Sequence, residues 1–261
     1  MRTAFLVLTG ALLAAAEPAT LSELGGHFVA YEPVYFALDP AYGERQVNAK
    51  FQLSFACRVV GKDSVQEAGP DGLYAAYSQT SFWDLETESM PFLDSSYRPE
   101  TWWHVSLPAL ASAEALALEP GIGHESNGLS GDASRSLNHV FVRALGQWRH
   151  GDLIISANPR ARIYTEKDDN PDIAEYRGHV DLSGSVRKDG SWGLAATGRI
   201  GDDWDKGSLM LELTHPATSW TGGWMHGYLY IQSFIGWSES LLGYDQRTDQ
   251  PRVLVGFSLT R

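Results

Sequence analysis

Residues 115–128, ALALEPGIGHESNG in one-letter code, are the stretch from which the fold of this chain can be inferred. In a β-strand, side chains two residues apart share a face. One face of a strand here carries, in order, Leu116, Leu118, Pro120, Ile122, His124 and Ser126. The other face carries Ala115, Ala117, Glu119, Gly121, Gly123 and Glu125. An apolar face therefore ends in a histidine and a serine that point the same way.

A second strand is predicted at 136–149, after the turn-rich residues 127–132. Its apolar face begins at Asn138 and continues through valine and alanine. An antiparallel hairpin would place Asn138 beside His124 on one surface. Serine, histidine and an amide are the side chains of a nucleophile, its base and a group that orients the base. Their place on an apolar outer face suggests chemistry on a lipid.

The rest of the chain alternates in the same way, and its second face is charged. That face carries Lys50, Gln52, Arg58, Arg160, Arg162, Asp181, Arg187 and Glu212. Such charges suit the polar lumen of an all-β transmembrane barrel, whose closed sheet leaves no edge exposed to lipid. We predict an antiparallel β-barrel of about twelve strands. The strands lie near 28–38, 46–59, 72–85, 97–107, 112–126, 136–149, 152–164, 175–187, 192–201, 206–215, 222–238 and 250–260.

The strand ends indicate which end of the barrel faces outwards. Aromatic residues gather there, as they do at membrane interfaces: Trp83, Trp102, Trp103, Trp148, Trp192, Trp224 and Trp237. The longer breaks fall on alternate connections, as the outer loops of a barrel do: 86–100, 127–135, 166–173 and 239–249. This arrangement places His124, Ser126 and Asn138 at the outer rim of the bilayer.

The first residues predict export. Arg2 precedes an apolar run at 4–13 and three alanines at 14–16, which is the pattern of a signal peptide. We expect cleavage of 1–16 before Glu17, leaving 17–261 as one barrel domain. The 20 Lys and Arg against 32 Asp and Glu give a net charge of −12, which argues against nucleic acid as a partner. The single Cys57 excludes an internal disulfide.

Several motifs give a specific resemblance. The segments GHESNG at 123–128 and SRSLN at 134–138 closely resemble the signature of the bacterial outer membrane phospholipase A family. Further matches follow the family's order over nearly all of 17–261. They are KFQLS at 50–54, SQ at 78–79 with Trp83, MPF at 90–92, YRPE at 97–100, DDNPDI at 168–173 and GWSESL at 236–241.

The resemblance implies a twelve-stranded barrel in the outer membrane, with its catalytic residues on the lipid-facing wall towards the outer leaflet. It implies a phospholipase A1/A2, a serine hydrolase that cleaves the sn-1 and sn-2 acyl esters of phospholipids and lysophospholipids. His124, Ser126 and Asn138 would form its catalytic triad, and a backbone N–H of Gly128 would bind the oxyanion. A neutral amide as third member avoids a further charge beside hydrocarbon.

Members of this family depend on calcium and act as homodimers. The resemblance therefore implies a calcium ion held by the Ser134 side chain, the Leu129 carbonyl oxygen and Ser89 of the partner subunit. Leu129 stands where a cationic residue is common in the family, and an acidic residue of the same loop is displaced to Asp132. Both departures bear on calcium affinity. The chain also ends in LTR at 259–261, where barrels often finish on an aromatic residue.

Three further sets of polar residues lead to expectations of their own. Gln79 would face lipid, where an amide is costly unless paired, so Gln79 of a second copy is a suitable match. Asp168 and Asp169 would either bind calcium or be solvated in a loop. The last set is expected in the lumen or in loops, and none of its members has metal-ligand spacing with another histidine or cysteine. It consists of His139, His150, His215 and His226.

Two other classes of protein would share some of these sequence features. A non-catalytic channel or transporter barrel of the outer membrane would also have a charged lumen, but it needs no outward triad. A soluble secreted esterase on a β-sandwich would also alternate, but it would bury its apolar faces.

Overall fold

The computed structural model describes residues 28–29, 31–40, 49–61, 71–108, 110, 112–202, 204–222 and 226–260. The predicted signal peptide at 1–16 lies outside these residues. Strand segments of the described residues are β1 Phe28–Val29, β2 Tyr35–Leu38, β3 Ala49–Gly61, β4 Gly72–Trp83, β5 Phe92–Ser106, β6 Ala115–Ser126, β7 Ser136–His150, β8 Leu153–Ala157, β9 Arg160–Glu166, β10 Val180–Lys188, β11 Gly193–Ile200, β12 Gly207–Pro216, β13 Tyr228–Trp237 and β14 Arg247–Ser258. Two short helices are α1 Ile173–Arg177 and α2 Thr218–Thr221.

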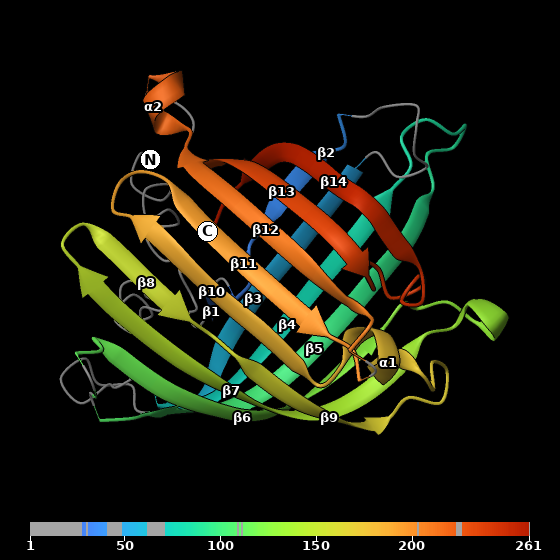
Figure 1. Cartoon of the computed structure of the whole chain (residues 1–261), viewed down its shortest axis with the longest axis horizontal. Helices are drawn as coiled ribbons and strands as arrows, with labels where there is room; N and C mark the ends of the chain where they lie inside the picture. The colour runs from blue at the N-terminus through green and yellow to red at the C-terminus, as the bar shows by residue number, and fades with distance from the viewer. Residues whose placement is uncertain are drawn as a thin grey trace.

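These segments form a closed antiparallel barrel (Figure 1). Two of its strands are interrupted: β1 and β2 both pair with β3, and β8 and β9 both lie between β7 and β10. Pro159, which has no N–H to donate, lies in the second break. Pairing of β2 with β14 closes the sheet. The described part of the chain therefore forms a barrel of 12 strands, which confirms the predicted fold class.

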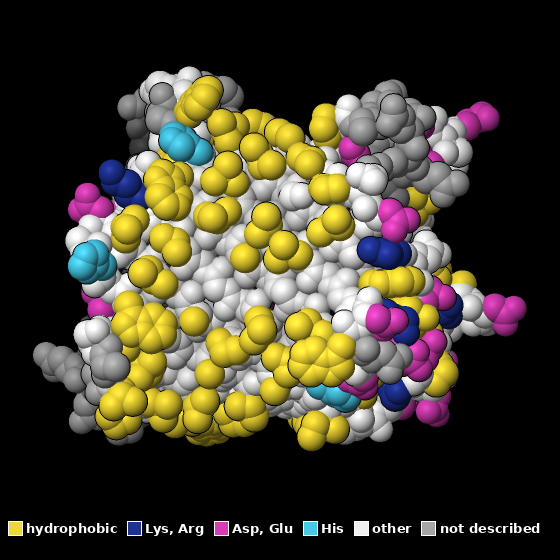
Figure 2. Space-filling view, viewed as in Figure 1, with side chains coloured by type: hydrophobic (Ala, Val, Ile, Leu, Met, Phe, Trp, Pro, Cys, Tyr) yellow, Lys and Arg dark blue, Asp and Glu magenta, His cyan; other side chains and the backbone are white. Residues whose placement is uncertain are grey.

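The two faces of the sheet have opposite polarity. Apolar side chains face outwards; Leu53, Ile122, Ile163, Leu182, Leu194 and Val255 are all exposed. In Figure 2 such side chains spread over the visible wall, while charged ones gather towards its ends. Polar side chains face the lumen and are buried, among them Lys50, Gln52, Glu119, Arg162 and Arg187. A water-soluble sandwich has the opposite arrangement, with its apolar side chains inside. The polarity seen here fits a wall surrounded by lipid.

Charged residues in the lumen are paired with one another. Glu119 accepts hydrogen bonds from Arg143 and faces the ring of His104, and the carboxylate of Asp181 lies between Arg162 and Arg199. Large rings fill the space beside them: Trp102 stacks against Tyr31 and Tyr74, with ring centroids 4.8 and 5.6 Å apart. A lumen crossed by such contacts weighs against the open pore that a channel needs.

The outer mouth of the barrel holds α1, at the same end as the β6–β7 and β13–β14 connections (Figure 1). Ile173 of α1 is fully buried in a cluster with Leu137, Leu241 and Tyr244. Gly178 ends the helix at φ +63°, and a Cβ atom there would lie only 1.9 Å from the Ile200 carbonyl oxygen. Only glycine fits this position, so the C-terminal end of α1 is fixed against the β11 strand end.

Three local expectations were wrong. Residues 92–96 lie in β5 and not in a loop, because Ser95 bonds to Ser81 of β4 with 2.8 Å between the hydroxyl oxygens. Residues 175–177, predicted as the start of the strand 175–187, belong to helix α1, because they leave the wall to close the mouth. Trp102 belongs to the lumen and not to an interfacial girdle, since its ring stacks between two tyrosines. None of the helices among the described residues is long and apolar enough to cross a membrane.

We expect Arg177→Met to lower the free energy of unfolding by about 3–5 kcal/mol, because it leaves a buried carboxylate, that of Glu125, without its cation. Arg177 Nη1 donates to Glu125 Oε2 at 2.6 Å, and both side chains are less than one-tenth exposed. Denaturant unfolding in lipid vesicles measures the loss. Adding Glu125→Gln should recover most of it.

The matched control is Arg149→Gln, which breaks the exposed ion pair of Arg149 with Glu114. That change should cost less than about 1 kcal/mol, because water screens exposed pairs. Equal losses for Arg177→Met and Arg149→Gln would contradict the importance of the buried pair.

Candidate active site

The outer end of β6 carries two side chains of the predicted triad, His124 and Ser126. Residues Leu118, Pro120 and Ile122 are exposed on the outer wall, and Glu119 and Glu125 are buried inside. His124 and Ser126 continue the outer set, as the alternation predicts. Both side chains are only partly exposed.

Asn138 lies directly opposite His124 in the β6–β7 pair. Its Oδ1 atom is 2.7 Å from Nδ1 of His124, which is a hydrogen-bond distance. The predicted juxtaposition of these two residues is therefore present. On its other side, the amide nitrogen Nδ2 of Asn138 donates to a carboxylate oxygen of Glu166, the last residue of β9.

Gly128 follows Ser126 closely and adopts φ +71°. A Cβ atom at this position would lie 3.0 Å from the ring of Tyr97, the residue that pairs with Ser126 across β5 and β6. Positive φ and the nearby ring both favour glycine. Gly128 lies two residues after Ser126, so its backbone N–H is a candidate donor to an oxyanion at this end of β6.

Asn127 organises the connection from β6 to β7. Its side chain is buried; Oδ1 accepts from the backbone N–H groups of Leu129 and Arg135, and Nδ2 donates to the Ala133 carbonyl oxygen at 2.8 Å. These three bonds tie both halves of the connection to one amide. Ser134 is held on this connection as a result.

The loop that follows β9 contacts the same connection. The hydroxyl of Ser134 donates to Asp169 Oδ2 at 2.8 Å. The fully buried Asn170 accepts from the Ser136 backbone N–H at 3.1 Å. Asp169, and not its neighbour Asp168, is thus the hydrogen-bond partner of Ser134. Tyr244 lies in the β13–β14 connection and packs against α1. Burial and the carboxylate of Asp172 raise the pKa of Tyr244, so its hydroxyl stays protonated and donates a hydrogen bond to Asp172 Oδ1.

The Ser134 hydroxyl and the Asp169 carboxylate, oxygen donors of the kind that calcium prefers, therefore meet at one place. The carbonyl of Leu129 belongs to the same connection as Ser134, and Leu129 is 48% exposed. The donor set fits a hard cation, since one ligand is a carboxylate and the others are neutral oxygens. No cluster of three or more histidine, cysteine or acidic residues suited to a metal occurs in the described ranges.

Ser89, the predicted ligand from a partner subunit, lies in the β4–β5 connection. It is exposed, with φ +79°, at the outer end of the barrel. The next residue, Met90, accepts a hydrogen bond from Trp83 Nε1 at 2.7 Å. Within one chain, Ser89 and Ser134 lie on different connections, β4–β5 and β6–β7.

Gln79 of β4 is partly exposed on the outer wall, as predicted. Its Oε1 accepts from the Tyr77 hydroxyl at 3.0 Å, and its Nε2 donates to Ser81 Oγ at 3.1 Å. An amide has two donor hydrogens and two acceptor lone pairs. Gln79 therefore keeps one donor and one acceptor for a second copy of the chain.

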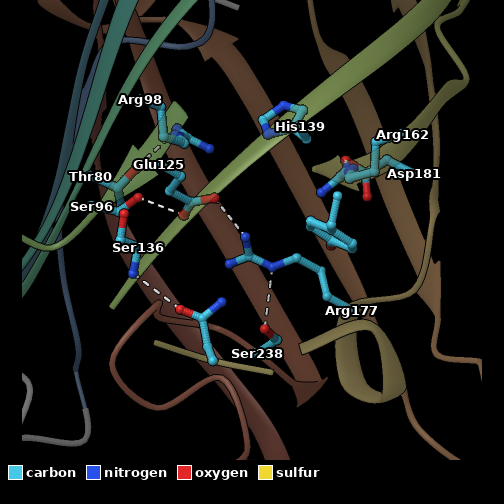
Figure 3. Close-up of polar contacts among 12 residues, drawn as sticks. Thr80, Ser96, Arg98, Glu125, Ser136, His139, Arg162, Arg177, Asp181 and Ser238 are labelled. Atoms are coloured by element: carbon cyan, nitrogen blue, oxygen red, sulfur yellow. Dashed lines mark hydrogen bonds and ion pairs between the residues drawn. The ribbon is translucent and has the colours of Figure 1, made fainter. Parts of the chain in front are cut away.

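Polar residues inside the barrel contact the outer end of β6 from the lumen side. Glu125 lies between His124 and Ser126 but points into the lumen, where Figure 3 shows it between Ser96 and Arg177. Ser96 Oγ donates to Glu125 Oε1 at 2.7 Å, and Arg177 Nε reaches Ser238 Oγ at 3.4 Å. Burial opposes the charge on Arg177, but Glu125 outweighs this effect and raises the pKa of the guanidinium.

Sequence reasoning did not identify three of these residues. Asn127 has a recognisable signal, because asparagine at a turn commonly bonds to nearby backbone groups. Glu125 could have been found from its inward position between two outward residues. Glu166 was placed in a loop, and nothing in the alternation of β9 indicates its contact with Asn138.

Comparison with known proteins agrees with this geometry. The profile of the Phospholipase A1 family matches residues 29–259. Phospholipase A1 of Escherichia coli strain K12 is 32% identical over 228 residues, which cover 85% of this chain and 72% of that protein.

Two solved structures share the fold. The Salmonella typhi outer membrane phospholipase, a dimer with bound calcium, has a TM-score of 0.76 at 28% identity and covers 95% of this chain and 98% of its own. The Escherichia coli outer membrane phospholipase A has a TM-score of 0.72 at 29% identity, with coverage of 89% and 91%. The chain thus belongs to the phospholipase A1 family and is a phospholipase of the outer membrane.

Proposed function

We propose that this phospholipase cleaves the sn-1 and sn-2 acyl esters of phospholipids, and those of lysophospholipids, on the outer wall of its barrel. Ser126 is the nucleophile, His124 the general base and Asn138 the residue that orients the base. The observation that carries this proposal is the 2.7 Å contact between His124 Nδ1 and Asn138 Oδ1, on the lipid-facing side of the strand that ends at Ser126.

The acylation half of the reaction begins with attack of Ser126 Oγ on the ester carbonyl carbon. The hydroxyl proton passes to Nε2 of His124, because Nδ1 is engaged with Asn138. The tetrahedral intermediate then collapses, and the C–O bond to the glycerol oxygen breaks. That oxygen leaves with the proton held by His124, and the acyl group remains on Ser126.

Deacylation uses water in place of the serine. His124 Nε2 takes a proton from the water, whose oxygen attacks the acyl carbonyl carbon. The bond to Ser126 Oγ breaks, the serine regains a proton from His124, and a fatty acid leaves. In both halves the backbone N–H of Gly128 donates to the developing oxyanion, and such donors contribute about 3 kcal/mol each in related sites.

Calcium is the cofactor that the oxygen donors favour. Ser134, Leu129 and Asp169 would hold it in one chain, together with Ser89 of the partner subunit. When bound, calcium adds positive charge that stabilises the oxyanion. A backbone carbonyl serves as the ligand at position 129, so leucine in place of a cationic side chain leaves that ligand intact. The related Salmonella typhi structure with bound calcium supports this assignment.

The active form is a homodimer. A single convex wall offers no groove for two acyl chains, whereas two walls placed side by side create one. Gln79 keeps hydrogen-bonding capacity for its counterpart, and the related Salmonella typhi structure is a dimer. A calcium ion bound between subunits must favour the dimer by the same factor as the dimer favours calcium.

Ser126→Ala should lower phospholipid hydrolysis by on the order of 10⁴-fold or more, and His124→Ala nearly as much. Asn138→Ala should cost about 10²-fold, because the imidazole loses orientation but remains. The measurement is acyl hydrolysis by detergent-refolded protein, with heat-dependent gel mobility as the check on folding. Near wild-type activity of a folded Ser126→Ala protein would remove the nucleophile assignment.

Ser134→Ala should weaken calcium binding and dimerisation together, whereas Gln79→Ala should mainly weaken dimerisation. The reason is that Ser134 would affect the dimer only through the calcium ion that it binds, whereas Gln79 would bond directly to the second copy. Calcium titration and sedimentation in detergent separate the two effects. Ser130→Ala is the matched control, since Ser130 is an exposed serine of the same connection that makes no capping hydrogen bond. A loss for Ser130→Ala equal to that for Ser134→Ala would argue against a ligand role.

A protein held at one barrel per nanodisc should hydrolyse phospholipid slowly, and a chelator should slow it further. Nanodiscs that hold two barrels should recover the rate when calcium is present. Hydrolysis at the full rate by single barrels with chelator would show that this mechanism is wrong.

A further inference from the structure

We propose that Glu166 is a positioning residue of this active site, acting on His124 through the side chain of Asn138. The proposal rests on the triad proposed above. The observation behind it is the hydrogen bond from Asn138 Nδ2 to the Glu166 carboxylate, which extends the array Ser126–His124–Asn138 by one acidic group.

A β-bulge brings Glu166 to the outer wall. In β9 the buried Arg162 faces the lumen and Ile163, which is 65% exposed, faces outwards. Strict alternation would turn Glu166 inwards with Arg162. The register shifts at this point: Glu166 pairs with Asn138 and Tyr164 with His139, so Thr165 has no opposite residue. One extra residue reverses the faces, and bulges of this kind commonly re-aim side chains next to active sites.

The hydrogen bonds from the carboxylate to the imidazole form a directed chain. A carboxylate can only accept, so the NH₂ group of Asn138 must face Glu166 and its carbonyl oxygen must face His124. That oxygen can only accept as well, so Nδ1 of His124 must carry the hydrogen. Nε2 then has the free lone pair that a base needs to take the serine proton. Without Glu166, the amide of Asn138 could turn over and present NH₂ to the imidazole.

The charge of Glu166 adds a second effect. In many serine hydrolases the third residue is itself a carboxylate that stabilises the imidazolium. Here the carboxylate stands one hydrogen bond further away, and donation to it makes the Asn138 carbonyl a stronger acceptor. The site thus keeps a neutral amide beside the apolar wall and places the charge at the end of β9, where the side chain is exposed.

The test is a mutant cycle measured as kcat and KM on a water-soluble nitrophenyl ester, which keeps weak variants measurable. Glu166→Ala should lower kcat about 10-fold, in the range typical of residues that orient a reacting group through another. KM should change little, since Glu166 does not touch the substrate. Glu166→Asp, which keeps an acceptor and its charge, should recover most of the loss.

The decisive measurement repeats Glu166→Ala in the Asn138→Ala background. If Glu166 acts through Asn138, its removal there should change kcat less than twofold. The matched control is Asp249→Asn, which removes the same charge from the outer end of β14 on another part of the rim, where Asp249 is 74% exposed. It should leave kcat unchanged.

The proposal is overturned if Glu166→Ala has wild-type kcat, or if its full loss persists without Asn138. It is also overturned if Asp249→Asn costs as much, because rim charge alone would then explain the result. These outcomes differ from failure of the triad itself, which would show as activity in Ser126→Ala. Inactivation by a sulfonyl fluoride gives an independent reading, since its rate reports activation of Ser126 and should fall in parallel with kcat.

Discussion

The requirement that every backbone N–H and C=O group be paired in a hydrocarbon layer underlies this structure. A sheet meets that requirement only when its first and last strands join, as β2 and β14 do here. Closure separates an outer face, which must be apolar, from an inner face that can be polar. The period-2 alternation of each strand then decides which side chains meet lipid and which meet the lumen.

That separation also decides on which side of the wall the proposed catalytic residues lie. His124 and Ser126 occupy outward positions, while Glu125 between them points inwards to Ser96 and Arg177. The end of β6 that carries His124 and Ser126 is therefore held from the lumen by charged hydrogen bonds, without polar groups added to the lipid side. Breaking a buried ion pair such as that of Glu125 and Arg177 is costly. This interior network can therefore hold the adjacent outer residues in position.

The connections at the outer end of the barrel add polar groups that the strands do not carry. Asn127 folds the β6–β7 connection around one amide and thereby fixes Gly128, Leu129 and Ser134 relative to the end of β6. The loop after β9 adds Asp169 to the same place, and the bulge before it turns Glu166 towards Asn138. Loops on a rigid barrel thus bring oxygen and amide groups to the outer end of β6, and binding and catalytic residues commonly lie on such loops.

By itself, the sequence determined the closed all-β fold, the strand count, the outward face of His124, Ser126 and Asn138, and the polar lumen, because alternation and turn residues are local signals. The pairing of the predicted strands 112–126 and 136–149 also followed, because consecutive strands commonly pair and alternation places His124 and Asn138 on the same face. Only the tertiary structure decided the place of Trp102 among lumen tyrosines, the helix 173–177 in the mouth, and the contacts of Asp169 and Glu166. These depend on residues far apart in the chain, and in β9 on one unpaired residue that reverses the alternation, so no local pattern can reveal them.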